Sequence, residues 1–254
     1  MRCEHERKQH SENCFITLTY DPEQIPKGHT LRKIDLQRFI NTLRKHLWRT
    51  YKKKVRFYAC GEYGTKSYRP HYHILLFGWE PPAGDRKLLQ KSGSDNPTYN
   101  SATLNRLWDR GNVVCGSLSL HSAVYVASYI SKNHGRKWEF DIICGDGELI
   151  RREKEFSLMS RRPGIGSGYV SKYANELIAH DNVILEGREV PLPRYYDEQL
   201  VKQQHQTEKE LLKTKDKRHK LTWQNTKKEN TPERRRVREK YSHSTMKLFS
   251  KGEI

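Results

Sequence analysis

The sequence lacks paired cysteines and long apolar runs. Its five cysteines are an odd number, and no two of them form a C-x-x-C pair. This argues against a disulfide framework and a structural zinc ribbon, and it predicts free thiols in a reducing compartment. No apolar run is long enough to span a bilayer, and no secretory signal follows Met1. We therefore expect no membrane partner.

Hydrophobic residues are scarce, and acidic residues are outnumbered by basic ones. The chain has 254 residues, of which 34% are hydrophobic, and its 48 Lys and Arg against 30 Asp and Glu give a net charge of +18. So large a charge indicates a polyanionic partner, usually nucleic acid. Half of the surplus falls in residues 199–254, with 16 Lys and Arg against 7 Asp and Glu. We predict that this tail is a charged helix or a disordered arm.

The remaining chain predicts a mixture of strands and helices. β-Branched and aromatic runs predict strands at residues 15–20, 55–62, 71–77 and 113–118. Helical spacing of apolar residues predicts helices at 2–12, from Asp35 to the basic cluster 52–54, at 104–108 and at 122–132, with Asp35 and Ser122 as N-caps. Residues 81–99 are interpreted as an exposed loop, and residues 139–160 as a hairpin turning at 145–147.

His71 and His73 stand two residues apart in a predicted strand. Residues i and i+2 of a strand point to the same face, so both imidazoles project together. Glu62 lies on the preceding strand of the predicted hairpin and can face His71. Two imidazoles and a carboxylate suit Mg²⁺ or Mn²⁺. The competing interpretation is a chance pair of solvated surface histidines.

Tyr125 and Tyr129 are four residues apart in a predicted helix, with Lys132 three residues further on. At this spacing the three side chains leave the same side of the helix. A phenol with an ordinary pKa of about 10 is a poor nucleophile at neutral pH and needs a strongly activated electrophile. A metal ion on a phosphate provides one, and Lys132 can offset charge in the transition state. The competing interpretation is an ordinary pair of core aromatics.

Basic and aromatic residues are interleaved around the predicted hairpin. Such a surface is typical of single-strand binding, where cations hold the backbone and rings stack on bases. The predicted DNA-binding residues are Lys53, Lys54, Arg56, Tyr63, Lys66, Arg69 and Tyr72. The competing interpretation is a solvated basic face with tyrosines at the edge of a sheet.

Four short motifs occur together in one order: residues 15–20 (FITLTY), 60–64 (CGEYG), 69–73 (RPHYH) and 125–132 (YVASYISK). In this combination the chain resembles the HUH endonucleases, and among them the rolling-circle replication initiators of microviruses, most of all those of gokushoviruses. The resemblance covers roughly residues 1–200.

The resemblance implies an α+β fold, with a central antiparallel sheet flanked by helices in a ferredoxin-like arrangement. It implies a nuclease domain at residues 1–198 and a basic tail at 199–254. His71, His73 and, with less support, Glu62 match metal ligands, while Tyr125 and Tyr129 match paired nucleophiles followed by Lys132. One tyrosine would nick the origin strand, form a 5′-phosphotyrosine link and later rejoin the ends.

The resemblance also implies partners and a location. The substrate would be single-stranded DNA at a viral replication origin, in the cytoplasm of a bacterial host. Because the sequence contains no P-loop, a host helicase and a host DNA polymerase are expected.

Three other functions use the same features in part. A non-catalytic single-stranded nucleic-acid binding protein would use the basic surface but not two tyrosines beside a metal. A relaxase or transposase would share the histidine pair, but relaxases usually place the tyrosine near the N-terminus, and many transposases use one tyrosine. A zinc hydrolase would leave both tyrosines unexplained.

Overall fold

The computed structural model describes residues 1–64, 67–90, 97–132, 141–226 and 231–249, and within these it leaves out the side chains of residues 90, 121, 128–132 and 245–249. The chain divides into two compact units. The larger is Cys3–Ile165, and the smaller joins Met1–Arg2 to residues 166–254. The predicted extent of the nuclease domain, residues 1–198, remains a prediction, because this structural division does not show which residues the activity needs.

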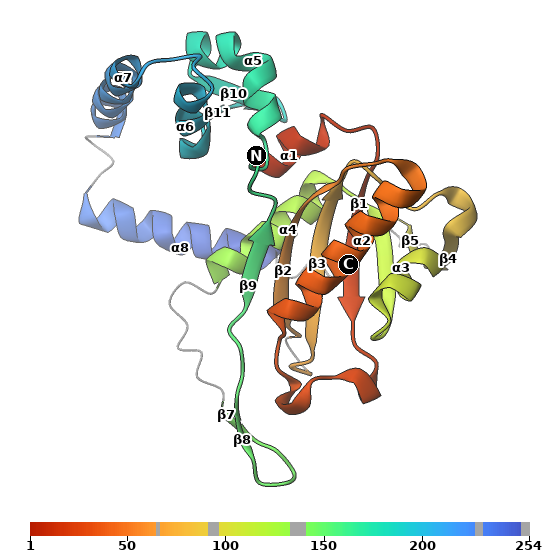
Figure 1. Cartoon of the computed structure of the whole chain (residues 1–254). Helices are drawn as coiled ribbons and strands as arrows, with labels where there is room; N and C mark the ends of the chain where they lie inside the picture. Colours follow the sequence, from red (N-terminus) through yellow and green to blue (C-terminus); the bar gives the residue numbers. More distant parts are fainter. Residues whose placement is uncertain (65–66, 91–96, 133–140, 227–230, 250–254) are drawn as a thin grey trace. The chain divides into compact units, whose positions relative to one another are not determined.

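A seven-stranded antiparallel sheet forms the larger unit (Figure 1). Its strand order is β4-β5-β6-β1-β3-β2-β9, so β1 lies at the centre and β9 at one edge. The strands are β1 (Asn13–Thr19), β2 (Arg56–Tyr63), β3 (Pro70–Phe77), β4 (Arg86–Gln90), β5 (Thr98–Ser101), β6 (Val113–Ser117) and β9 (Phe156–Met159). The α+β fold and the predicted 62/71 hairpin are both confirmed.

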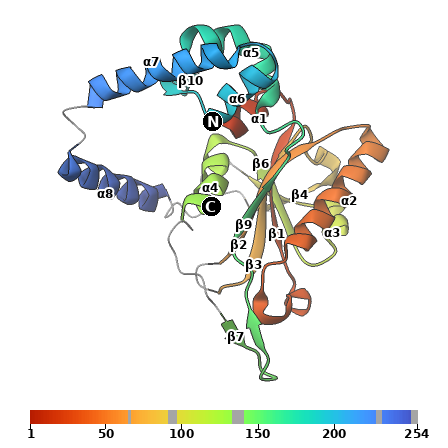
Figure 2. The ribbon, with the colours of Figure 1, turned by 60° about the vertical axis from the view of Figure 1, so that its left-hand side comes forward.

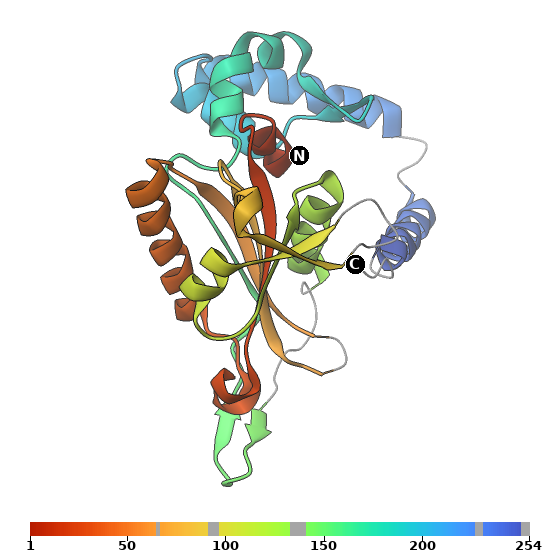
Figure 3. The same ribbon diagram turned by 90° about the vertical axis from the view of Figure 1, so that its right-hand side faces the viewer.

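Helices cover the two faces of this sheet. They are α1 (Arg2–Arg7), α2 (Lys33–Tyr51), α3 (Ala102–Trp108) and α4 (Leu120–Lys132), with short 3-10 turns at Pro22–Gln24, Lys27–His29 and Ala83–Asp85. Figures 2 and 3 show α2 and α3 on one side of the sheet and α4 on the other. The alternation of side chains along each strand decides which residues face which helix.

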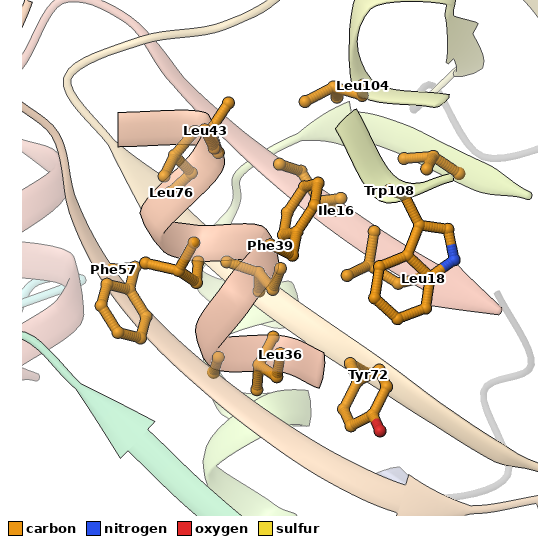
Figure 4. Packing of buried hydrophobic residues seen from close by; sticks show 14 of the residues in the cluster. Ile16, Leu18, Leu36, Phe39, Leu43, Phe57, Tyr72, Leu76, Leu104 and Trp108 are labelled. Carbon is orange, nitrogen blue, oxygen red and sulfur yellow. The ribbon is translucent and has the colours of Figure 1, made fainter. Parts of the chain in front are cut away.

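The larger hydrophobic core lies between the sheet and α2. Alternate residues of the central strands point into it, including Ile16, Leu18, Tyr72 and Leu76 (Figure 4). The apolar stripe of α2 supplies the opposite wall, with Leu36, Phe39, Ile40, Leu43 and Leu47 all buried. These five residues recur at spacings of three and four, which is the pattern that predicted the helix.

The other face of the sheet carries a smaller core under α4. It contains Leu75 and Phe77 of β3, together with Ala123 and Val126 of α4. His71 and His73 share this face with Leu75 because they differ from it by even numbers of residues. The predicted histidine pair therefore faces the helix that carries the predicted tyrosines.

Two predictions of local structure are wrong in detail. Asp35 is not the N-cap of α2, because the helix begins at Lys33; the Asp35 carboxylate instead accepts a hydrogen bond from Tyr20 Oη at 2.9 Å. Residues 81–99 are not only a loop, since β4 and the start of β5 lie within this range and pair with each other. Pro, Gly and Ser in this stretch hid a short pair of edge strands.

Residues 139–160 form more than the predicted hairpin. The described part contains a two-stranded hairpin, β7 (Asp141–Ile143) with β8 (Leu149–Arg151), around the predicted turn. The chain then continues into β9, which pairs with β2 and extends the main sheet. A pairing across about 100 residues of sequence leaves no local signal in the chain.

The smaller unit is mostly helical. Its elements are α5 (Ser167–His180), β10 (Asn182–Leu185), β11 (Arg188–Pro191), α6 (Arg194–Lys202), α7 (Glu208–Thr226) and α8 (Pro232–Phe249). Its core includes Val170, Leu177, Tyr196 and Leu200. The basic tail is thus helical where the structure describes it. Among the described helices, none is both long enough and apolar enough to cross a membrane.

Candidate functional site

Glu62, His71 and His73 converge on the α4 face of the sheet. Glu62 Oε1 lies 2.7 Å from His71 Nε2 and 2.7 Å from His73 Nε2. One ligand atom from each residue can be chosen so that all lie within 4.8 Å of one another. Glu62 and His73 are 2% and 6% exposed, and His71 is partly exposed. The arrangement is a compact group of potential ligands with one side open.

Strand register brings these residues together. Glu62 pairs with His71 across β2 and β3, and Cys60 pairs with His73. Side chains of directly paired residues lie on the same face, and residues i and i+2 share it too. One hairpin therefore places all three side chains on one patch, as the sequence predicted.

Hydrogen bonds on the far side of each imidazole fix the ring orientation. His71 Nδ1 lies 3.2 Å from the carbonyl oxygen of Arg69, which can only accept, so Nδ1 carries the proton and Nε2 is left to face Glu62. His73 Nδ1 lies 3.0 Å from Thr17 Oγ1 on β1. Such outer partners hold histidines in the orientation that a metal needs.

The three groups shift one another's pKa values. Burial raises the pKa of Glu62, but hydrogen bonds from His71 and His73 outweigh it and bring the pKa below its ordinary value. Burial lowers the pKa of His71, but the bond to Glu62 outweighs it and the net pKa is raised. For the more deeply buried His73, burial prevails and the pKa is lowered. The site thus favours an ionised carboxylate beside one neutral imidazole.

The group fits a divalent cation. Glu62 Oε2 is buried and has no hydrogen-bond partner in the part of the chain that the structure describes. A buried carboxylate oxygen without a partner is costly, and a cation would satisfy it. Two imidazole nitrogens and a carboxylate form a mixed donor set that is suitable for Mg²⁺, Mn²⁺ or a similar ion.

Tyr125 lies beside this group. Its ring meets the His73 ring edge to face, with 5.3 Å between the centroids. Helix α4 holds it there because Ala123 and Val126 are buried against the sheet on either side in the sequence. Tyr129 follows one turn later, and Lys132 ends the helix; their side chains lie outside the described part.

Two of the predicted DNA contacts are wrong, because the rings are in the core. Tyr72 is 0% exposed, and its hydroxyl donates to the Arg32 carbonyl oxygen at 3.0 Å. Tyr63 is 8% exposed, and its hydroxyl donates to the Glu153 carbonyl oxygen at 2.8 Å. Neither ring is open for a base to stack on. Both point to the α2 face, opposite the histidines.

The basic residues predicted to contact DNA divide into two locations. Lys53, Lys54 and Arg56 lie at the start of β2, about six residues or roughly 20 Å along the strand from Glu62. Arg69 lies at the site end of the hairpin, where its guanidinium donates to the Tyr20 carbonyl oxygen at 2.7 Å. Lys66 falls outside the described residues. Only Arg69 is thereby placed near the histidines.

Sequence reasoning missed two neighbours of His73. Thr17 bonds its Nδ1, and Phe15 stacks on its ring with centroids 5.3 Å apart and 16° between the planes. Both lie on β1, which pairs with β3 so that Thr17 faces His73. The alternation in FITLTY placed the two residues on one face, but it did not indicate which strand they would face.

The central antiparallel sheet, with its two histidines on a central strand and a tyrosine helix packed over them, defines the class: this is the HUH endonuclease fold. Within that class, residues 13–134 match the family model of the replication-associated proteins of the ORF2 type, and this part of the chain belongs to that family. The resemblance to the replication initiators of microviruses is confirmed at the level of the family.

Phage proteins are among the similar sequences. Replication-associated protein VP4 of Bdellovibrio phage phiMH2K is 33% identical over 205 residues, which are 78% of this chain and 61% of the relative. Replication-associated protein ORF2 of Spiroplasma virus 4 is 31% identical over 217 residues, which are 82% of this chain and 64% of the relative. The chain thus spans less than two thirds of these relatives' length. No solved structure matches it.

Proposed function

We propose that this chain is a metal-dependent endonuclease that nicks one DNA strand at a phage replication origin and becomes linked to the 5′ end through a tyrosine. The observation that carries the proposal is the packing of the Tyr125 ring against His73, a member of the Glu62, His71 and His73 group. A nucleophile and a site for a phosphate-binding cation thus adjoin. The names of the phage relatives support a role in replication.

In the proposed reaction the Tyr125 hydroxyl oxygen attacks the scissile phosphorus. The phenolic proton passes to water, the new O–P bond forms, the bond from phosphorus to the 3′ oxygen breaks, and that oxygen takes up a proton as the leaving 3′ hydroxyl. A bound divalent cation supplies charge neutralisation on the phosphate oxygens. Lys132 is proposed to offset further negative charge.

Rejoining is the reverse of this step. A 3′ hydroxyl attacks the phosphotyrosine, and the tyrosine leaves with its proton restored, so no external energy source is needed. Tyr129, four residues from Tyr125 on α4, is proposed to perform the second cleavage of a replication cycle. Two tyrosines on one helical face would let successive strand transfers use one metal site.

The proposed partners follow from this chemistry. The substrate is single-stranded DNA at an origin, and a host helicase and polymerase would open and copy the genome in the bacterial cytoplasm. Mg²⁺ or Mn²⁺ is the proposed cofactor, held by Glu62, His71 and His73.

The test is formation of a protein–DNA adduct that survives boiling in detergent. Purified protein is incubated with labelled single-stranded origin DNA and Mn²⁺, with and without EDTA. We expect an adduct with the wild type, none in EDTA, and none with the Tyr125→Phe/Tyr129→Phe double variant. Each single variant shows which tyrosine attacks first.

The controls separate catalysis from binding. Tyr51→Phe changes an exposed tyrosine of α2 and should leave the adduct unchanged. An adduct that persists in the double variant would contradict the proposal. Tight, salt-sensitive binding without any adduct would instead support a non-catalytic single-strand binding protein.

A further inference from the structure

A groove of about 810 Å³ runs between helix α2 and strand β9. It lies on the α2 face of the sheet, whereas Glu62, His71 and His73 lie on the α4 face. Strand β9 is the last strand at that edge of the sheet (Figure 1). The groove is therefore a separate concavity, and nothing in the proposed nicking site accounts for it.

The lining of the groove is strongly cationic. Its charged residues are Lys33, Arg38, Arg44, Arg161 and Arg162, and no carboxylate lines it. Lys33, Arg38, Arg161 and Arg162 have exposed side chains, and none has an acidic partner among the described residues. Like charges gathered in a concavity repel one another unless a counter-ion lies between them. The groove is thus built to hold an anion.

Arg44 shows the crowding of charge most clearly. Its guanidinium donates to Ser160 Oγ at 3.0 Å and lies over the Phe57 ring, 5.0 Å from the centroid. Burial and the positive charge of Arg56 lower its pKa. Within the described ranges no carboxylate compensates this half-buried cation, which stands at the inner wall of the groove.

The remaining lining residues suit nucleobases. Apolar surface comes from Ile34, which is 42% exposed, and from the partly buried Leu158 and Met159 of β9. Gln37 and Asn41 add exposed amides, which can donate and accept hydrogen bonds as base edges do. Cations for phosphates beside apolar surface and amides for bases are the usual elements of a single-strand groove.

We propose that the α2–β9 groove binds a segment of single-stranded DNA that continues from the strand held at Glu62, His71 and His73. This rests on the proposed function for the identity of the substrate. The volume is in the range of small-ligand pockets, which is room for a few nucleotides and too little for a duplex. Mixed apolar and amide surface also serves unpaired bases, whereas a duplex would present mainly phosphates.

The topology adds a dependence on the length of the DNA. The metal site involves β2 and β3, and β2 is followed at the edge by β9 alone. A strand that occupies both places must pass around this edge, because they lie on opposite faces. Short oligonucleotides will fill only the nicking site, and longer ones will also reach the groove.

The test is equilibrium binding in EDTA, so that neither metal nor cleavage is involved. The variant Arg38→Gln/Arg161→Gln/Arg162→Gln removes three groove cations and keeps their length. Its control, Arg49→Gln/Lys87→Gln/Arg106→Gln, removes three exposed cations outside the groove. Affinity is measured by fluorescence anisotropy for single strands of increasing length, over a range of salt concentrations.

We expect the groove variant to bind long strands at least tenfold more weakly than the control, and short strands equally well. Loss of three phosphate contacts should reduce the slope of log affinity against log salt by about 2, at roughly 0.7 for each contact with a single strand. Equal binding by the two variants at every length would overturn the proposal. A selective loss of duplex binding, with single-strand binding intact, would overturn it as well.

The outcome is independent of the nicking activity. A groove defect without any protein–DNA adduct would refute the nickase and leave the groove assignment standing. An active nickase whose groove variant binds long strands like the control would refute the groove and leave the nickase standing.

Discussion

Glu62 has the most constrained environment in the site. Its Oε1 faces two imidazole nitrogens, and its Oε2 is buried without a partner among the described residues. A carboxylate serving only the fold would have both oxygens hydrogen-bonded or in water. The orphaned oxygen is the observation at this scale that most favours a bound cation.

Replacement of Glu62 by Gln tests this directly. The amide keeps the shape and removes the charged ligand, so we expect Mn²⁺ affinity to fall by at least tenfold, the lower end of the loss seen when only outer partners of a ligand are removed. Calorimetric titration measures it. The control is Glu153→Gln, an exposed carboxylate. Equal affinity in wild type and Glu62→Gln would show that Glu62 is not a ligand.

His5 predicts a dependence of stability on pH that is unrelated to the metal site. Its side chain is 1% exposed, and burial lowers its pKa from 6.5 to about 4. Between these values the unfolded chain binds a proton that the folded chain does not. The free energy of unfolding therefore falls as the pH is lowered from 6.5 to about 4.

The measurement compares wild type with His5→Phe. Urea unfolding of both is followed at the two ends of this pH range, and the other titrating groups are common to both proteins. The wild type should lose more stability on acidification than the variant. The same loss in both would mean that His5 is not held neutral by its surroundings.

At the scale of elements, the site depends on one hairpin and on one helix packed over it. The hairpin was predictable because its signals are local: alternation along residues 71–77, a short connection and a preceding strand. The position of Thr17 opposite His73 was not, because β1 and β3 are 56 residues apart at this contact. Pairing of distant strands follows from the complete core, and a short motif does not contain it.

Tyr72 shows a prediction that conflicted with its own premise. If His71 and His73 share one face of β3, the residue between them points to the other face. That face is covered by α2, and Tyr72 is fully buried there. The alternation that correctly predicted the metal site therefore also excluded Tyr72 from contact with DNA at that site.

Helix α7 is held largely by one arginine. Arg218 donates to Asp181 at 2.7 Å and to Asp197 at 2.7 Å, and the Asp197 side chain is 4% exposed. Leu211 is the buried residue of this helix. Charged residues dominate the rest of α7, so packing alone provides little to fix it.

Arg218→Met should loosen α7 selectively. It leaves the Asp197 carboxylate buried without its counter-charge, which costs about 2 to 3 kcal/mol, below the usual range for a fully buried pair because Arg218 is partly exposed. Hydrogen exchange of residues 208–226 should accelerate by about fiftyfold or more, with residues 13–77 unchanged. Lys217→Met, at an exposed neighbour, is the control; equal exchange in both variants would contradict the role of the ion pairs.

At the scale of the whole molecule, the low hydrophobic content has a structural origin. The larger unit has an extensive core, with 22 buried residues in its main cluster. Helix α8, by contrast, has no buried residue among its described side chains, and it includes Arg234, Arg235 and Arg236. The composition thus averages a well-packed sheet domain with exposed basic helices, which is why it indicated a partly extended chain.

The distribution of charge separates what the sequence could and could not predict about DNA binding. The net charge of +18 indicated a polyanion without locating its path. The groove depends on Arg161 and Arg162 meeting α2, more than 110 residues away in sequence, and only the folded chain brings them together. Positive charge near the hairpin was overvalued, since Lys53, Lys54 and Arg56 lie at the end away from the histidines.

The most direct test of the nickase is to locate the covalent bond. The adduct formed with single-stranded origin DNA and Mn²⁺ is digested with protease and nuclease, and the nucleotide-bearing peptide is sequenced by mass spectrometry. The account predicts a phosphotyrosine ester on Tyr125 or Tyr129, and no modified peptide when EDTA is present. A nucleotide on any other residue, or cleaved DNA with no modified peptide, would contradict it.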